Sequence, residues 1–261
     1  MADQVLLDTA QRLFRDHCDK ERWDLAEQGE FPQALWQALV DNGFVEMGLP
    51  DSGFELSDLY AILRIAGAHA APLALAELLL GVHWTGQSAQ RVSVGFAAGD
   101  ESAAQVPWGR NADQVLVLPA EAGPAADLDG TLELPLLAVD AQRTVHDANI
   151  AGEPRDMVHG GLSGSVAVRS PYALLSLARA VQMSGCMSTI LELALQYATE
   201  RSQFGRPISK FQAIQHSLAV TAAEVAAAIS TTELAYAMDT FYFLIAGAFV
   251  MWMAAGFAML E

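Results

Sequence analysis

Positive charge is scarce in this sequence of 261 residues. It holds 14 lysines and arginines against 31 aspartates and glutamates, for a formal net charge of −17. A protein that binds nucleic acid needs a basic face for the phosphates, so this deficit argues against nucleic acid as a partner. Cysteine is scarce too, because only Cys18 and Cys186 occur, and they lie far apart. We expect two free thiols in a reducing cytoplasm rather than a disulfide scaffold.

The sequence also lacks the marks of secretion and of a metal centre. Its first thirty residues mix charges of both signs and contain no apolar run of the kind that begins a secretory signal, so we expect a cytoplasmic protein. Most of the histidines have no partner at ligand spacing, and surface or helix-capping roles are expected for them. These are His17, His69, His83, His146 and His159. We predict no metal site.

The spacing of apolar residues predicts a mainly α protein with a central β domain. Helical spacing is present in residues 3–20 and 31–42 and continues to about residue 88, which makes residues 1–89 an N-terminal helical domain. Short Val- and Leu-rich runs separated by Gly, Pro and Asp predict a β middle domain over residues 90–170. Helical spacing returns over residues 171–237, with one helix of about 30 residues and a second that begins near Ile208.

The last segment, residues 238–261, differs from the rest. Its residues 241–260 contain no charged side chain and no polar face. Twenty such residues match the roughly 30 Å hydrocarbon thickness of a bilayer. The sequence therefore allows membrane association through this tail alone.

The few cations gather where the two long helices meet, in the stretch YATERSQFGRPISKFQAIQHSLA. Arg201, Arg206 and Lys210 fall within ten residues there. Arginine can fork onto phosphate oxygens, and the free N–H groups at the start of the second helix favour an anion. With an aromatic plate at Phe204, the pattern suits a nucleotide diphosphate. The alternative is that Arg201 pairs with Glu200 or another carboxylate and that Phe204 belongs to the core.

The same stretch resembles the signature of the acyl-CoA dehydrogenase family, E-R-x-Q-F-G-x-P-I-x-x-F-Q-x-x-Q-H-x-L-A. The segment GFVEMGLPDSGFELSDLYAILRIAGAHAAPLALAELLL resembles the family's first domain, so the resemblance covers about residues 1–236 and is weak in the middle. It implies an N-terminal helical domain, a β middle domain and a C-terminal helical bundle, here incomplete. It also implies an FAD-dependent oxidoreductase that dehydrogenates an acyl-CoA thioester of fatty or steroid type, passes electrons to an acceptor, and forms homo- or hetero-oligomers.

The resemblance assigns roles residue by residue. In the family, the arginine, the glutamine and the phenylalanine of R-x-Q-F-G meet the FAD of a neighbouring subunit, as does the glutamine of F-Q. The corresponding cofactor-binding residues here are Arg201, Gln203, Phe204 and Gln212. His216, in the Q-H of the signature, is expected to pack between helices.

Several departures from the family pattern limit what the resemblance implies. The T-E-P-x-x-G-S-D loop and the W-I-[ST] strand that hold the flavin ring are absent, and we expect Trp108 to be a buried structural residue. The catalytic glutamate is not identifiable. Some relatives carry it about 26 residues before the motif arginine, where this chain has Leu175. Glu192 and Glu200 are expected to be solvated. The chain therefore resembles the degenerate subunits that some bacterial acyl-CoA dehydrogenases pair with a competent one.

The tail carries a resemblance of its own. MDTFYFLIAGAFVMWMAAGFAMLE is similar to the beginning of the first membrane helix of ammonium transporters. This predicts a truncated fusion, whereas the alternative is a fully buried helix of a bundle. Three hypotheses follow: a truncated acyl-CoA dehydrogenase, a non-catalytic partner subunit that completes an FAD site, and a fusion fragment carrying a transporter helix.

Overall fold

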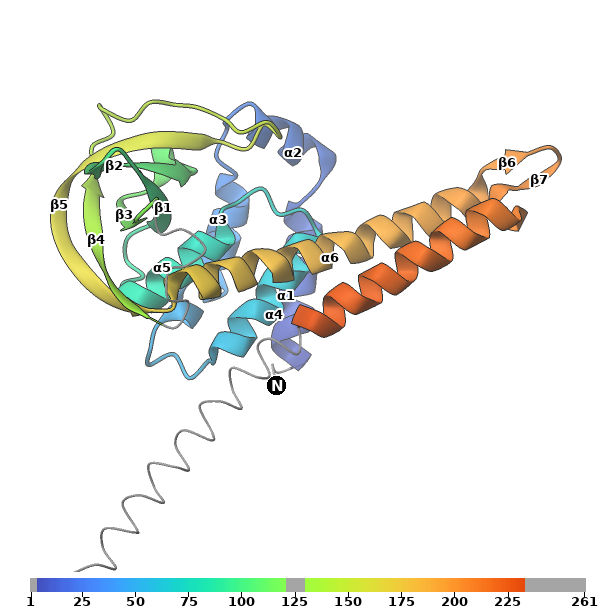
Figure 1. The fold of residues 1–261 in the computed structure, drawn as a ribbon, viewed down its shortest axis with the longest axis horizontal. Coiled ribbons are helices and arrows are strands. Elements are labelled where there is room, and N and C mark those ends of the chain that lie inside the picture. Colours follow the sequence, from blue (N-terminus) through green and yellow to red (C-terminus); the bar gives the residue numbers. More distant parts are fainter. Residues whose placement is uncertain (1–3, 121–129, 233–261) are drawn as a thin grey trace, which may run out of the picture. The chain divides into compact units, whose positions relative to one another are not determined.

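The computed structural model describes residues 4–120 and 130–232 (Figure 1). The chain divides into two compact units, Met1–Cys186 and Met187–Glu261, and each is described by itself. These two units do not test the predicted division into four segments, which stays a prediction. The apolar tail, residues 238–261, lies outside the described residues.

The first unit begins with helices. The second helix has Asp19 as its N-cap, whose side chain accepts a hydrogen bond from the Arg22 backbone N–H at 3.0 Å. This cap divides residues 3–20, which were predicted to form one helix, between two helices. A capping box starts the fourth, with Glu55 as N-cap and Asp58 as its partner. The helices are α1 (Gln4–His17), α2 (Lys20–Glu27), α3 (Gln33–Asp41), α4 (Leu56–Ala68) and α5 (Leu75–Thr85), with a short 3₁₀ turn η1 (Glu46–Gly48).

Five strands then close into a barrel (Figure 1). They are β1 (Val92–Ala98), β2 (Asp100–Pro107), β3 (Gln114–Leu118), β4 (Thr131–Val139) and β5 (Arg155–Arg169). The order around the barrel is β1-β2-β5-β4-β3, and the parallel pair β1–β3 closes it. Small and branched side chains fill the interior, among them Ala104, Val106, Val115, Val117, Leu137 and Val158. Sequence patterns missed β2, whose DESAAQVP lacks the Val-rich alternation of the other strands.

The 30-residue helix α6 (Pro171–Glu200) confirms the predicted long helix. In the first unit it crosses α4 at glycines. A Cβ on Gly67 would lie 2.0 Å from the Gln182 carbonyl oxygen, and one on Gly185 would lie 2.0 Å from the Arg64 carbonyl oxygen. The two helix backbones therefore touch, which only glycine permits at these positions.

The second unit contains the end of α6, a tight hairpin and a further helix. A 3₁₀ turn, η3 (Ile208–Lys210), stands where the second long helix was predicted to begin, and the helix starts at residue 212 and continues to 232. Among the described helices, α6 is long and apolar enough to cross a membrane by length and composition, and only 28% of its most apolar window is buried. One such helix is weak evidence for a membrane protein. The mainly α fold with a central β barrel agrees with the predicted fold class.

Candidate functional site

The basic stretch forms a two-residue hairpin in the second unit. Strands β6 (Ser202–Gln203) and β7 (Arg206–Pro207) pair antiparallel, with Gln203 opposite Arg206. Between them lie Phe204 (φ 52°) and Gly205 (φ 77°). Positive φ at both central positions is the conformation of a type I′ turn. Glycine adopts it freely, whereas a phenylalanine held there costs of order 1–3 kcal/mol.

Phe204 is strained and exposed at the same time. Phe204 is 92% exposed, and its ring forms a T-shaped pair with that of Phe211, at 6.2 Å between centroids. The alternative that Phe204 belongs to the core is therefore wrong in this chain. A strained backbone that presents an aromatic ring to solvent is a feature of binding sites, where a ligand or another chain covers the ring.

The guanidinium of Arg201 is oriented by the helix that precedes it. It lies 5.6 Å from the ring centroid of Tyr197, one turn earlier in α6. The predicted alternative of an ion pair with Glu200 is not formed, since the Glu200 carboxylate accepts a hydrogen bond from Gln196 instead. The backbone of Arg201 is also held, because its carbonyl accepts a hydrogen bond from the Ile208 N–H at 2.9 Å.

The neighbouring cations are equally available. Arg206 stacks over Phe211 at 4.3 Å from the ring centroid. Within residues 4–120 and 130–232, none of the ion pairs found involves Arg201, Arg206 or Lys210. Three exposed cations without carboxylate partners make a surface that an anion can neutralise.

All four predicted site residues lie in the hairpin or next to it in the chain. Gln203 and Phe204 lie in the hairpin, Arg201 directly precedes it, Gln212 opens the following helix, and all four are exposed. Sequence reasoning missed the two aromatic supports under the arginines. The spacing of Tyr197 four residues before Arg201 could have indicated the first, because such pairs share a helix face.

Three expectations about single residues have an outcome in the structure. Glu192 and Glu200 are exposed, as predicted. His216 is exposed, so the prediction that it packs between helices is wrong for this chain. It lies on the side of its helix opposite to the half-buried Ile214 and Leu218.

Among the described residues, no group of three His, Cys, Asp or Glu side chains could hold a metal ion.

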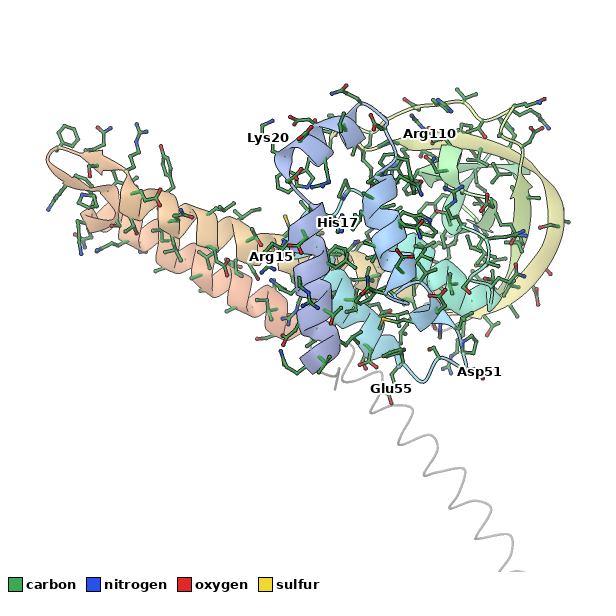
Figure 2. All side chains as sticks on the ribbon, turned by 180° about the vertical axis from the view of Figure 1, so that it is seen from behind. Arg15, His17, Lys20, Asp51, Glu55 and Arg110 are labelled. Atoms are coloured by element: carbon green, nitrogen blue, oxygen red, sulfur yellow. The ribbon has the colours of Figure 1, made fainter. Side chains whose placement is uncertain are left out.

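The barrel turn that carries Trp108 is locked by a buried carboxylate. Asp156, fully buried on β5, accepts hydrogen bonds from the Arg110 backbone N–H at 2.7 Å and from Arg110 Nη2 at 2.6 Å. Figure 2 labels Arg110 among the side chains at the barrel. Trp108 takes a left-handed conformation (φ 53°) and is 5% exposed, packed with Ala26 and Ala74. The expectation that Trp108 is a buried structural residue is confirmed.

The position expected for a helix-borne base is apolar and covered. Leu175 is 7% exposed. The next residue towards the N-terminus, Leu174, accepts a hydrogen bond from the Tyr60 hydroxyl through its carbonyl at 3.3 Å. Nothing at this point of α6 can take a proton from a substrate.

Solved structures with this architecture decide the fold. A steroid ACAD variant, Tcur3481-Tcur3483, is 23% identical, with a TM-score of 0.65 over 88% of this chain and 77% of that chain. The ChsE4-ChsE5 complex from Mycobacterium tuberculosis is 19% identical, with a TM-score of 0.68 over 89% of this chain and 76% of that chain. This chain has the acyl-CoA dehydrogenase fold.

Sequence comparisons agree with the acyl-CoA dehydrogenase fold over part of the chain. Residues 172–240 match the family model of the acyl-CoA dehydrogenase C-terminal domain, a segment that includes the whole hairpin. A curated relative, 3-(aryl)acrylate reductase of Clostridium sporogenes, is 33% identical over 96 residues, which are 36% of this chain. The matched segment spans only 24% of that relative's length.

Proposed function

We propose that this chain is a flavoprotein of the acyl-CoA dehydrogenase family and that its hairpin grips the pyrophosphate of FAD. The observation that carries the proposal is the exposed cluster of Arg201, Arg206 and Phe204. In the described part of the chain no carboxylate pairs with these two arginines, and the Phe204 ring is exposed to solvent. FAD, when bound, would supply the redox chemistry by accepting a hydride from an acyl-CoA thioester.

We expect the four predicted residues to contact different parts of FAD. Arg201 can donate two parallel hydrogen bonds to phosphate oxygens, with its guanidinium already held over Tyr197. Phe204 offers an open ring face against which a heteroaromatic base can stack. Gln203 and Gln212 offer exposed amides that can donate or accept at the remaining polar atoms.

The test is retention of flavin after substitution of Arg201. Arg201→Ala should weaken FAD binding by about 1.5–3 kcal/mol, because a hydrogen bond to a charged group is lost. Arg201→Lys should give a smaller loss, since lysine keeps the charge without the fork. Both are measured by flavin fluorescence titration, with any companion subunit present. The control is Arg143→Ala, which removes an exposed arginine from the first unit. Equal flavin affinity in Arg201→Ala and in wild type would count decisively against the assigned role.

Two observations favour a second candidate, a non-catalytic subunit that completes the FAD site of a partner. Trp108 packs into the helical half of the first unit rather than offering its face to a ring, and Pro107 before it has no N–H to donate. The place of a helix-borne base is taken by the buried Leu175. A chain of this kind would hold a cofactor without carrying out proton abstraction.

The surface of α6 supports a partner chain. Within the second unit, Ile190, Leu193 and Tyr197 recur at helical spacing and are 56%, 59% and 55% exposed. Large apolar side chains in one stripe are usually covered by another chain. Each of the two structures named above is identified by a pair of proteins, which suits a hetero-oligomer.

Co-expression separates the two candidates. If the chain is a complete enzyme, it purifies alone with flavin absorbance that bleaches when acyl-CoA is added. If it completes a partner's site, flavin is retained and bleached only when the companion is co-expressed. A chain that takes up no flavin in either condition would overturn both candidates.

A further inference from the structure

A buried carboxylate joins α5 to α6 in the first unit. Glu77 stands in the first turn of α5 and is only 4% exposed. Its Oε1 accepts a hydrogen bond from Nη2 of Arg179 on α6, and Nη1 of the same guanidinium donates to Gln182 at 3.0 Å. The other carboxylate oxygen, Oε2, is buried without a hydrogen-bond partner in the described chain. The carboxylate is therefore only half satisfied.

Charged groups reach Glu77 from each element that faces it. Arg179 comes from α6, while Arg155 on β5 and Glu153 just before it act from the barrel side. Glu153 and Arg155 pair with each other at 3.1 Å, so their effects on Glu77 largely cancel. Arg179 is itself 36% exposed, which screens its attraction. Burial therefore dominates and raises the pKa of the Glu77 carboxyl above its ordinary 4.5, against the lowering by Arg179.

We propose that Glu77 is a proton-controlled clasp between α5 and α6, in which proton uptake at Oε2 tightens the packing of the first half of α6 and proton loss loosens it. The geometry carries this inference, because among the described residues no group donates a hydrogen bond to the buried Oε2, which can therefore take up a proton. The packing cannot adjust by sliding α6, since Gly67 and Gly185 hold the α4–α6 backbones in contact.

The direction follows from linkage. The packed state holds Glu77 with a raised pKa, so it binds the proton more tightly than a state in which Glu77 meets water. The clasp's contribution is fully present below pH 4.5 and is lost as the pH rises through the raised pKa. Charging the buried carboxylate at higher pH weakens the attachment of α6.

The test compares wild type with Glu77→Gln, which keeps the shape of the side chain but cannot be charged. At pH 8 the glutamine variant should melt at least about 2 °C above wild type, and this difference should shrink towards pH 5. Glu192→Gln, which neutralises an exposed carboxylate on α6, is the matched control and should have the melting temperature of wild type at both pH values. A glutamine variant that melts below wild type at pH 8, or a difference independent of pH, overturns the proposal.

Two further measurements keep the proposal testable if Glu77→Gln fails to fold. Arg179→Met removes the largest attraction that favours the charged carboxylate, so its melting temperature should fall more steeply with pH than that of wild type. In wild type, hydrogen exchange of peptides from residues 172–186, corrected for the intrinsic effect of pH, should be faster at pH 8 than at pH 5. An unchanged slope in Arg179→Met, or corrected exchange that does not depend on pH, overturns the clasp.

Discussion

At the scale of single residues, burial decides what the two cysteines can do. Cys18 is 8% exposed at the end of α1, and burial raises the pKa of its thiol to about 12, with a smaller lowering by Arg22. Only the thiolate is nucleophilic. Both cysteines are free in the structure, as the sequence predicted, but Cys18 belongs to the core rather than to a reactive site.

This gives a prediction for Cys18. In the folded chain at pH 8 it should be alkylated by iodoacetamide roughly a thousandfold more slowly than an ordinary cysteine, because its thiolate fraction is lower by about that factor. Peptide mass spectrometry of labelled protein measures this. Addition of denaturant is the control and should remove the protection. Fast labelling of native Cys18 would show that burial does not govern this thiol.

Phe204 is the residue at which local and global rules conflict. A phenylalanine at positive φ and in solvent lowers stability on two counts. Such conflicts are expected at functional sites, where a ligand or partner supplies what the isolated chain lacks. For this reason the hairpin, rather than the better-packed barrel, carries the proposed function.

At the scale of elements, α6 is held by backbone contact with α4. Alanine in a helix interior is normally about 1 kcal/mol more stable than glycine. Gly185→Ala should do the opposite and destabilise the chain by about 1–3 kcal/mol, because the new methyl group would lie 2.0 Å from the Arg64 carbonyl oxygen. Thermal melting checks the sign.

The control for Gly185→Ala is Gly161→Ala on β5, where an added Cβ meets nothing within 4 Å. This variant should melt within a few degrees of wild type. If Gly185→Ala melts above wild type, the close crossing of α4 and α6 is not present in solution.

At the scale of the whole molecule, charge is distributed unevenly. The chain has a net charge of −17, yet among the residues that the structure describes no ion pair is found for Arg201, Arg206 or Lys210, at and beside the hairpin. Long-range repulsion between the acidic chain and an anionic cofactor is offset only where the local potential is positive. The hairpin is therefore the place where we propose that a diphosphate binds.

A prediction at the same scale concerns the apolar tail. If residues 241–260 anchor the full chain to membranes, Ala246→Lys and Val250→Lys together should release it to the aqueous fraction, since each charge at the centre of a bilayer costs about 2.5–3.5 kcal/mol. Flotation of the full chain on lipid vesicles measures the partition. The control is the double variant Glu192→Lys and Glu200→Lys on α6, which should leave flotation unchanged. Flotation of the tail variant equal to that of wild type would assign membrane binding elsewhere.

Local signals in the sequence were enough to predict much of this protein. Helical spacing predicted α6 almost residue for residue. The Arg-rich motif places Arg201, Gln203, Phe204 and Gln212 close together in the sequence, and their role in binding a cofactor stays a prediction. Both depend on neighbours in the chain, and periodicity records such contacts directly. The capping of α2 by Asp19 and of α4 by Glu55 also depends on local chemistry, although the spacing of apolar residues alone did not separate α1 from α2.

Other features depended on contacts between residues far apart in the sequence. Strand β2 owes its existence to partners on β1 and β5 rather than to its own alanine-rich pattern. The Arg110–Asp156 lock, the glycine crossing of α4 and α6, and the burial of Glu77 join residues 46 to 121 positions apart. The spacing of residues along the sequence does not reveal such contacts, because the burial and the pKa of a carboxyl group depend on the residues that the fold places around it. The sequence alone determined most of the helices and strands and the basic motif, because these depend on neighbouring residues. The tertiary structure decided which charges are buried and which are paired, because these depend on residues far apart in the chain.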